Sequence, residues 1–256
     1  PTFTVEFTAD KPNAFLYAEL CDIHPDGAAT RVSYGLMNLT HLDGHEKVTY
    51  LEPGKKYKAT VTLDVCGHVF PKGHRVRLAV ANSFWPMIWP SPEKVTLKLD
   101  LSTAEFTLPI FTGKDTEGPN MEAKCAPLTP MTVLKEGVVN RQITYDLLTD
   151  SWTSITDGVG GVFGEGIYRF DDIGTVVEHN LKRILTVSNS DPSDARYEII
   201  QKMKNGRPGW EIDCDIDVVQ TADKENFYLT GFMDASINGE HAFHRDYDVT
   251  VPRNGL

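Results

Sequence analysis

The sequence contains little of what nucleic-acid-binding, membrane-spanning or disulfide-stabilised proteins need. Lysine and arginine number 25 against 36 acidic residues, a formal net charge of −11, and no basic cluster is present to release counterions from phosphates. No apolar run approaches the ~18 residues of a membrane helix. Four cysteines without CxxC spacing are typical of reduced thiols. We therefore expect a cytoplasmic protein with no nucleic-acid or membrane partner.

The motifs of a serine hydrolase and of a phosphate loop are also absent. An α/β-hydrolase holds its nucleophile in Gly-x-Ser-x-Gly, because a sharp strand-to-helix turn must expose the serine oxygen, and no serine here has that setting. The alternating strands and helices of such a fold are missing as well. The glycine-rich run 158–166 lacks a complete GxGxxG and a following lysine, so we predict a flexible loop or a bent strand start. We predict no catalytic residue in this chain.

Metal-binding motifs begin but are not completed. His45-Glu46 starts the HExxH pattern of zinc proteases without its second histidine. The acidic alternation 213–217 lacks the later glycine and glutamate of a calcium loop and is better explained as a solvated strand face. His241 and His244 are expected on opposite faces of a strand. The sequence therefore predicts no metal and no cofactor.

The sequence is rich in period-two alternation of apolar and polar residues, the pattern of half-buried strands. It occurs at 2–8, 57–65, 75–80 and 95–101, with proline- and glycine-containing turn clusters between these segments. No window shows a helical stripe. The pattern predicts an all-β protein that starts with a jelly-roll, galactose-binding-like β-sandwich. Because the first strand opens the sequence without a leader, we expect the chain to begin inside a fold.

A change of composition near 113–130 predicts two domains. Glycine, proline and charged residues gather there, so we place a β-sandwich at 1–115, a linker at 116–129 and a second antiparallel β domain at 130–256. In the second domain Asn238-Gly239 predicts a type I′ hairpin turn. An uninterrupted register after that turn would pair polar with apolar side chains, so we expect a β-bulge or a longer loop.

The segment 82–92 has the most unusual composition, with two tryptophans, a phenylalanine, a methionine and three prolines in eleven residues. It is either a loop packed over its own core or a contact surface for a ligand or another domain. The residues themselves leave both interpretations open. The side chains of interest are Phe84, Trp85, Met87 and Trp89.

Several segments of the first half resemble a known family. Residues 18–27, 51–57 and 68–78 are similar, in the same order, to parts of the C-terminal domain of X-Pro dipeptidyl-peptidases and cocaine esterase. Phe84-Trp85-Pro86 falls where that family has its Ser-x-Phe/Trp-Pro segment. Residues 130–256 are similar to the extra tail domain of longer hydrolases in the same group.

The resemblance implies a parent serine hydrolase whose Ser-Asp-His triad lies in an N-terminal α/β-hydrolase domain missing from this chain. The chain would then be the non-catalytic C-terminal part. Its expected role is to support the catalytic domain, help form the wall of the substrate cleft and contribute to a homo-oligomer, with Phe84, Trp85, Met87 and Trp89 at the interface or lining the cleft. The alternative is a stand-alone carbohydrate-binding module, which exposed coplanar tryptophan rings would favour.

Overall fold

The computed structural model describes residues 1–113, 126–161 and 164–256. Every regular element among them is a β-strand, apart from two three-residue 3-10 helices at Leu39–His41 and Pro192–Asp194. The predicted all-β class is therefore confirmed. Within these ranges, no helix has the length and apolar character that crossing a membrane requires.

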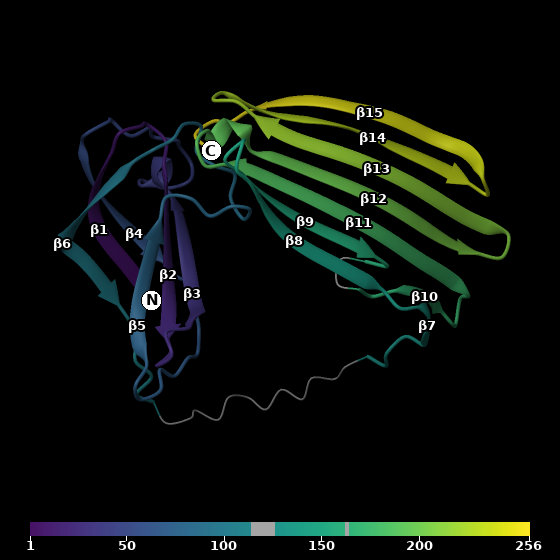
Figure 1. Ribbon diagram of the computed structural model, residues 1–256, viewed down its shortest axis with the longest axis horizontal. Coiled ribbons are helices and arrows are strands. Elements are labelled where there is room, and N and C mark those ends of the chain that lie inside the picture. Colours follow the sequence, from purple (N-terminus) through teal and green to yellow (C-terminus); the bar gives the residue numbers. More distant parts are fainter. Residues whose placement is uncertain (114–125, 162–163) are drawn as a thin grey trace. The chain divides into compact units, whose positions relative to one another are not determined.

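The chain divides into two compact units (Figure 1). One consists of Pro1–Thr116 together with Asn254–Leu256, and the other of Glu117–Arg253. The linker predicted at 116–129 lies largely outside the described residues, and its described end, from residue 126 onward, has no strand.

The first unit is a sandwich of two three-stranded antiparallel sheets. Its strands are β1 (Thr2–Ala9), β2 (Phe15–Ile23), β3 (Ala29–Asn38), β4 (Lys56–Thr62), β5 (Arg75–Ala81) and β6 (Leu97–Thr107). One sheet has the order β4-β1-β6 and the other β3-β2-β5. From β3 to β6 the chain changes sheet at every step, an alternation found in jelly-roll sandwiches.

The core of the sandwich accounts for the alternating sequence. Successive side chains of a strand point to opposite faces, and in β1 the side chains of Phe3, Val5 and Phe7 are at most 3% exposed. They pack in one cluster with Leu16 of β2 and Val61 of β4. Thr4 and Glu6, which lie between them in β1, are half-buried on the other face.

The final residues of the chain complete this unit. The Gly255 carbonyl accepts hydrogen bonds from Asn38 Nδ2 at 2.7 Å and from Thr40 Oγ1 at 3.1 Å. Asn38 Oδ1 in turn accepts from the Thr40 amide at 3.0 Å and so caps the first 3-10 helix. A side chain at Gly255 would collide with Val48 and would need a strained positive φ, which is +88° here.

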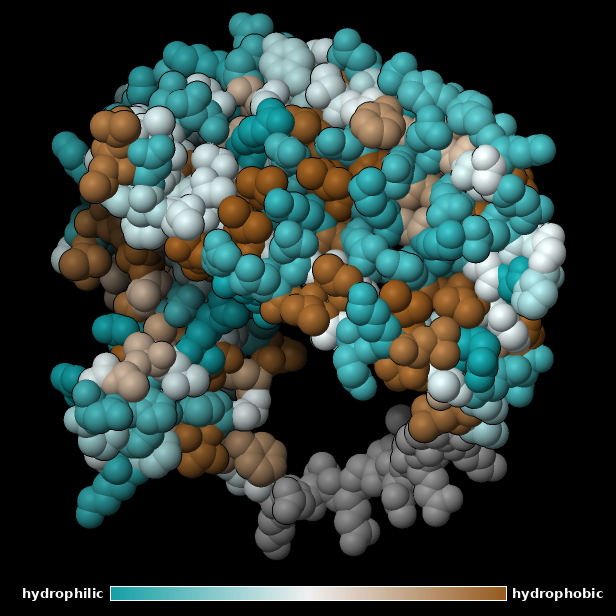
Figure 2. Space-filling model, turned by 45° about the vertical axis from the view of Figure 1, so that its right-hand side comes forward, coloured by the Kyte–Doolittle hydropathy of each residue, from teal (hydrophilic) through white to brown (hydrophobic). Residues whose placement is uncertain are grey.

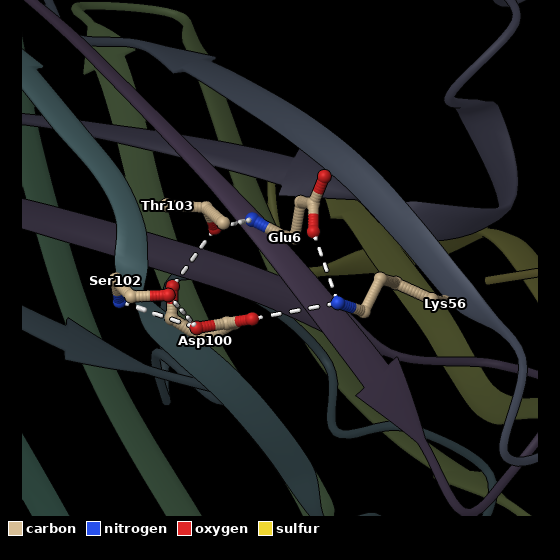
Figure 3. A network of polar contacts seen from close by, with 5 residues as sticks. All are labelled: Glu6, Lys56, Asp100, Ser102 and Thr103. Carbon is tan, nitrogen blue, oxygen red and sulfur yellow. Dashed lines mark hydrogen bonds and ion pairs between the residues drawn. The ribbon is translucent and has the colours of Figure 1, made fainter.

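A bulge interrupts the pairing of β1 with β6. Residues 101–104 of β6 stand opposite a single residue of β1, and the Glu6 amide donates to Thr103 Oγ1 at 3.1 Å (Figure 3). Thr103 Oγ1 donates to the Asp100 carbonyl at 2.9 Å. Lys56 Nζ lies 3.2 Å from Glu6 Oε2 and 3.4 Å from Asp100 Oδ2. These groups are solvent-accessible, so the network shapes the bulge and contributes little stability.

The second unit is one nine-stranded antiparallel sheet. Its strands are β7 (Met131–Lys135), β8 (Val138–Asp146), β9 (Ser151–Val159), β10 (Ile167–Phe170), β11 (Thr175–Ser188), β12 (Arg196–Arg207), β13 (Trp210–Ala222), β14 (Asn226–Ile237) and β15 (Glu240–Pro252). The main path is β15-β14-β13-β12-β11-β10-β7, and β9 also pairs with β11 and carries β8 on its other edge. The glycine-rich run 158–166 begins in the last two residues of β9, and its described glycines beyond that strand have positive φ; residues 162 and 163 of the run lie outside the described residues.

The hairpin between β14 and β15 has the predicted turn and the predicted bulge. Asn238 and Gly239 both have positive φ, +51° and +79°, as a type I′ turn requires. Ile237 pairs with Glu240, and the register then shifts between Ala235 and Ser236. Both predictions are confirmed.

The same bulge corrects the expectation for the two histidines of β15. His244 Nδ1 lies 2.9 Å and His241 Nε2 3.6 Å from Oδ2 of Asp234, so the rings are on one face and not on opposite faces. The prediction was wrong because a bulge inserts one residue between the histidines and reverses the alternation locally.

We expect truncation of the sandwich core to be costly. Phe7→Ala removes a ring that is 1% exposed and should lower the free energy of unfolding of the sandwich by about 3–5 kcal/mol. Native-state hydrogen exchange of peptides from β1 and β4 would measure this. Phe232→Ala, at a side chain 37% exposed on the other unit, is the matched control. Unchanged exchange in Phe7→Ala would contradict the assigned core.

Candidate functional site

The four side chains predicted as the site lie on the loop that follows β5. Asn82 Nδ2 donates to the Val95 carbonyl at 2.6 Å and so joins the start of the loop to its end. The Ile88 amide donates to the Phe84 carbonyl at 2.9 Å and closes a turn. The Trp85–Pro86 peptide bond is cis. Tertiary hydrogen bonds therefore hold an apolar loop in a defined conformation.

Phe84 anchors this loop to the sheet β3-β2-β5. Its ring stacks on Tyr17 of β2 with centroids 4.1 Å apart and lies 5.5 Å from Tyr34 of β3. The Tyr17 hydroxyl donates a hydrogen bond to Glu19. The pKa of Tyr17 is raised to about 12, mainly because the hydroxyl is buried and secondly because it bonds to the Glu19 carboxylate. Phe84 therefore positions the loop on the sheet.

Trp85, Met87 and Trp89 form the outer part of the loop. The two indole rings meet edge to face, with centroids 5.5 Å apart and an interplanar angle of 78°. Both are half-buried, and Met87 is 68% exposed. The three are not members of the buried core cluster. The loop therefore presents an apolar edge without the coplanar rings of a sugar-stacking platform.

A second cluster in the same unit, built around Asp22 at the end of β2, was not predicted. This carboxylate is 3% exposed, and each of its oxygens is bonded to a histidine. His74 Nδ1 lies 2.8 Å from Oδ1, and His68 Nε2 lies 3.0 Å from Oδ2. The His24 ring packs 4.6 Å from that of His74, and His24 Nε2 lies 3.0 Å from Thr30 Oγ1.

Strand pairing assembles this cluster from two distant segments. Ile23, next to Asp22, pairs with Arg75, next to His74, where β2 and β5 lie side by side. The turn that begins at His24 is closed by a hydrogen bond from the Gly27 amide to the His24 carbonyl, 2.9 Å long. One signal for the cluster is present in the sequence, because Asp22, His24, His68 and His74 lie within two segments that resemble the family. Their spacing matches no ligand motif.

Opposing effects set the electrostatics of Asp22. Burial raises the pKa of its carboxyl, whereas hydrogen bonds from His68 and His74 and the nearby charges of His74 and His24 lower it. The net shift is downward. The folded state therefore favours the carboxylate form.

The sheet of the second unit has two chemically different faces, because directly paired residues of neighbouring strands share a face. We call one the apolar face. Two rows of paired residues define it: Leu185, Tyr197, Gln220, Leu229 and Val249, then Arg183, Ile199, Val218, Gly231 and Tyr247. In β8 to β14, the charged side chains on the apolar face are arginines, including Arg141 and Arg183. None of the described residues of these strands places a carboxylate on this face.

The opposite face carries the charges that the sequence predicted for a solvated acidic strand. Lys204 Nζ lies 2.9 Å from Glu211 Oε1 and 3.7 Å from Asp213 Oδ1, and Lys202 Nζ lies 3.5 Å from Asp215 Oδ2. These side chains are about half exposed. No calcium-loop geometry arises here, since the carboxylates pair with the lysines of β12.

The apolar face is poorly covered. Trp152, Phe243, Val249 and Val251 are 42–44% exposed, although a sandwich would bury such side chains in its centre. Hydrophobic groups gather on the surface instead of being scattered singly (Figure 2). A hollow of about 270 Å³ opens on this face. The polar residues that line it are Arg183, Tyr197 and Gln220.

No arrangement for serine-based hydrolysis is present in the described ranges. Where serine hydroxyls there form hydrogen bonds, the partners are serine or threonine hydroxyls, aspartates or backbone groups, and none is a histidine; Ser91 Oγ is buried without a partner. A serine activated by an adjacent histidine is therefore missing from the described part of the chain.

Comparison with known proteins concerns the first unit. Residues 1–125 match the X-Pro dipeptidyl-peptidase C-terminal non-catalytic domain. A protein of Streptomyces avermitilis assigned as a Xaa-Pro dipeptidyl-peptidase is 37% identical over 84 residues, which cover 33% of this chain and 12% of the relative. The cocaine esterase of Rhodococcus sp. is 29% identical over 69 residues, covering 27% of this chain and 12% of the esterase. The predicted resemblance is confirmed for this region, and that of 130–256 stays a prediction.

We expect the Asp22 carboxylate to stabilise the sandwich in a pH-dependent way. A carboxyl whose folded pKa lies below the unfolded value of about 3.9 stabilises above that pH, and this contribution is lost as the pH falls through the folded pKa. Asp22→Asn should therefore lower the melting temperature at pH 7, with a smaller difference from wild type near pH 3. Circular dichroism melts would measure this, with the exposed Asp43 changed to Asn as control. A pH-independent difference would contradict the assignment.

Proposed function

Because residues 1–125 match the X-Pro dipeptidyl-peptidase C-terminal non-catalytic domain, we propose that this chain is the non-catalytic C-terminal region of an α/β-hydrolase-type serine hydrolase. Its role is to support the catalytic domain of that enzyme and its substrate cleft. The names of the relatives include a peptidase and an esterase, so the proposal is a hydrolase of this group. The free thiols of Cys21, Cys66 and Cys214 are in keeping with a reducing compartment such as the cytoplasm.

The observation that carries this proposal is the poorly covered apolar face of the nine-stranded sheet. Interfaces between domains of one chain typically cover ~600–1,500 Å². If even ~600 Å² of apolar surface stays exposed, the protein lacks the hydrophobic stabilisation that burying this area would give. At ~25 cal/mol per Å² that free energy is at most roughly 15 kcal/mol. A face of this kind is expected where another protein layer covers it.

The charges of the apolar face favour a different protein layer over a second copy of the chain. In a two-fold symmetric dimer the same patch lies on both sides, so Arg183 and the other arginines of β8 to β14 would face a copy of those strands that offers no carboxylate on this face. A catalytic domain with an apolar surface and acidic groups at its edge would complement them. The hollow next to Arg183 would accept one projecting side chain of that partner.

The loop with Phe84, Trp85, Met87 and Trp89 is the second proposed contact, at the interface or lining the cleft. Its outer tryptophans are apolar, half-buried and held by Phe84 on the sheet, as residues at the centre of an interface often are. The edge-to-face geometry of the rings weighs against the carbohydrate-binding alternative, because a sugar stacks on an open ring face.

The chain by itself should have no hydrolase activity. The purified chain would be incubated with X-Pro p-nitroanilide and p-nitrophenyl ester substrates, with a heat-killed sample and a serine-directed inhibitor as controls. We expect release of p-nitroaniline or p-nitrophenol at the heat-killed rate, since no activated serine is present in the described residues. Inhibitor-sensitive turnover above that rate would contradict the proposal.

The isolated chain should associate as salt increases. A net charge of −11 and the arginines of the apolar face oppose association at low salt, and the Debye length falls from ~30 Å at 0.01 M to ~3 Å at 1 M. Sedimentation velocity should therefore give a rising weight-average coefficient across this range. Phe243→Ser on the apolar face and Trp85→Ser on the loop should each reduce the rise. Phe232→Ser, on the opposite face, is the control, and a strictly monomeric wild type would refute exposed docking surfaces.

A further inference from the structure

We propose that Asp22, His24 and His74 form a binding site for a divalent transition metal, with zinc as the best match. The inference is independent of the proposed role in a hydrolase. One ligand atom from each of these residues lies within 4.8 Å of the other two. Asp22 is 3% exposed and fixed at the end of β2, and both histidines are half-buried.

The spacing of the ligand atoms is close to what zinc needs. Tetrahedral zinc with bonds of about 2.0–2.1 Å to nitrogen and oxygen places its ligand atoms roughly 3.3 Å apart. His74 Nδ1 is already 2.8 Å from Asp22 Oδ1. The His24 ring lies against that of His74 and belongs to a turn closed by Gly27. A small rotation of the His24 side chain would therefore bring the three ligands to one ion.

His68 completes the surroundings of the site. Its Nε2 lies 3.0 Å from the other oxygen of Asp22, and its side chain is 32% exposed. In that position it can be the fourth ligand, and the third nitrogen, or can orient the carboxylate through a hydrogen bond, as outer groups do around protein-bound metals. In the second case water takes the fourth coordination position.

The chemistry of the donors selects the class of metal. Calcium and magnesium prefer sets composed of oxygen ligands, whereas two or three imidazoles with one carboxylate suit zinc and its neighbours in the first transition row. No thiol belongs to the set. We therefore expect zinc and cobalt(II) to bind, and calcium and magnesium to bind far more weakly.

A purely structural explanation of the cluster makes a different prediction. In that explanation, hydrogen bonds from His68 and His74 to Asp22 hold the segment 64–74 on β2. The protons of these hydrogen bonds then occupy the space that a metal ion would take. A metal must displace those protons, so binding releases them. The earlier expectation that no metal binds rested on the incomplete motifs at His45 and 213–217, and these segments contribute nothing to this cluster.

The test uses the whole chain after treatment with a chelator and dialysis. Cobalt(II) chloride would be titrated while the visible absorption bands of the bound ion are recorded, and zinc chloride would be titrated by calorimetry in two buffers of different ionisation enthalpy. We expect one equivalent of either metal to bind, with release of protons that is revealed by the buffer dependence of the heat.

His24→Ala is the decisive variant, since His24 has no hydrogen bond to Asp22 and its removal leaves the His68 and His74 bonds in place. It should weaken binding of zinc at least tenfold and abolish the rise in melting temperature on addition of zinc. In chelator the variant should stay folded, with only the small decrease in melting temperature that follows from loss of the Thr30 hydrogen bond. His74→Ala should weaken binding equally, and His45→Ala is the control with unchanged affinity. Absence of binding at about 0.1 mM zinc chloride, or affinity unaffected by His24→Ala in a folded protein, would overturn the proposal.

Discussion

A β-sheet stabilises a protein only through the faces that another layer covers, and this constraint governs the two units differently. In the sandwich, Phe7 of β1 and Leu16 of β2 face each other's sheets and are almost fully buried. In the nine-stranded sheet, the corresponding side chains Phe243 and Val249 stay more than 40% exposed. The sandwich therefore has a core of its own, whereas the long sheet has an apolar face that is suited to a partner layer.

The charges of the long sheet follow the same division between its faces. Lys202 and Lys204 pair with carboxylates of β13 on the polar face, so that face is electrostatically satisfied in water. The apolar face has arginines and is without carboxylates in β8 to β14. Arginine covers apolar surface with its stem and offers a planar group for carboxylates. In β8 to β14 such a face is complementary to an acidic and apolar neighbour.

In the sandwich, the sheet β3-β2-β5 positions both features that bear on function. It supports Phe84 through Tyr17 and thereby the tryptophan loop. It also brings Asp22 next to His74 through the pairing of β2 with β5. The two features differ in chemistry, since one is an apolar edge fit for contact with a protein and the other is a compact set of nitrogen and oxygen donors. The proposed contact surface and the proposed metal ligands therefore share no residue.

The sequence by itself determined the features that depend on local chemistry. Alternation of apolar and polar residues specified strands, since side chains of a strand alternate between faces, and Asn238-Gly239 specified a hairpin because both residues tolerate positive φ. Tertiary structure alone decided which distant side chains meet. Asp22 and His74 are joined by a strand pairing that no spacing reveals, and one bulge placed His244 on the face of Asp234. Such outcomes depend on long-range register, and a shift by one residue moves a side chain to the other face.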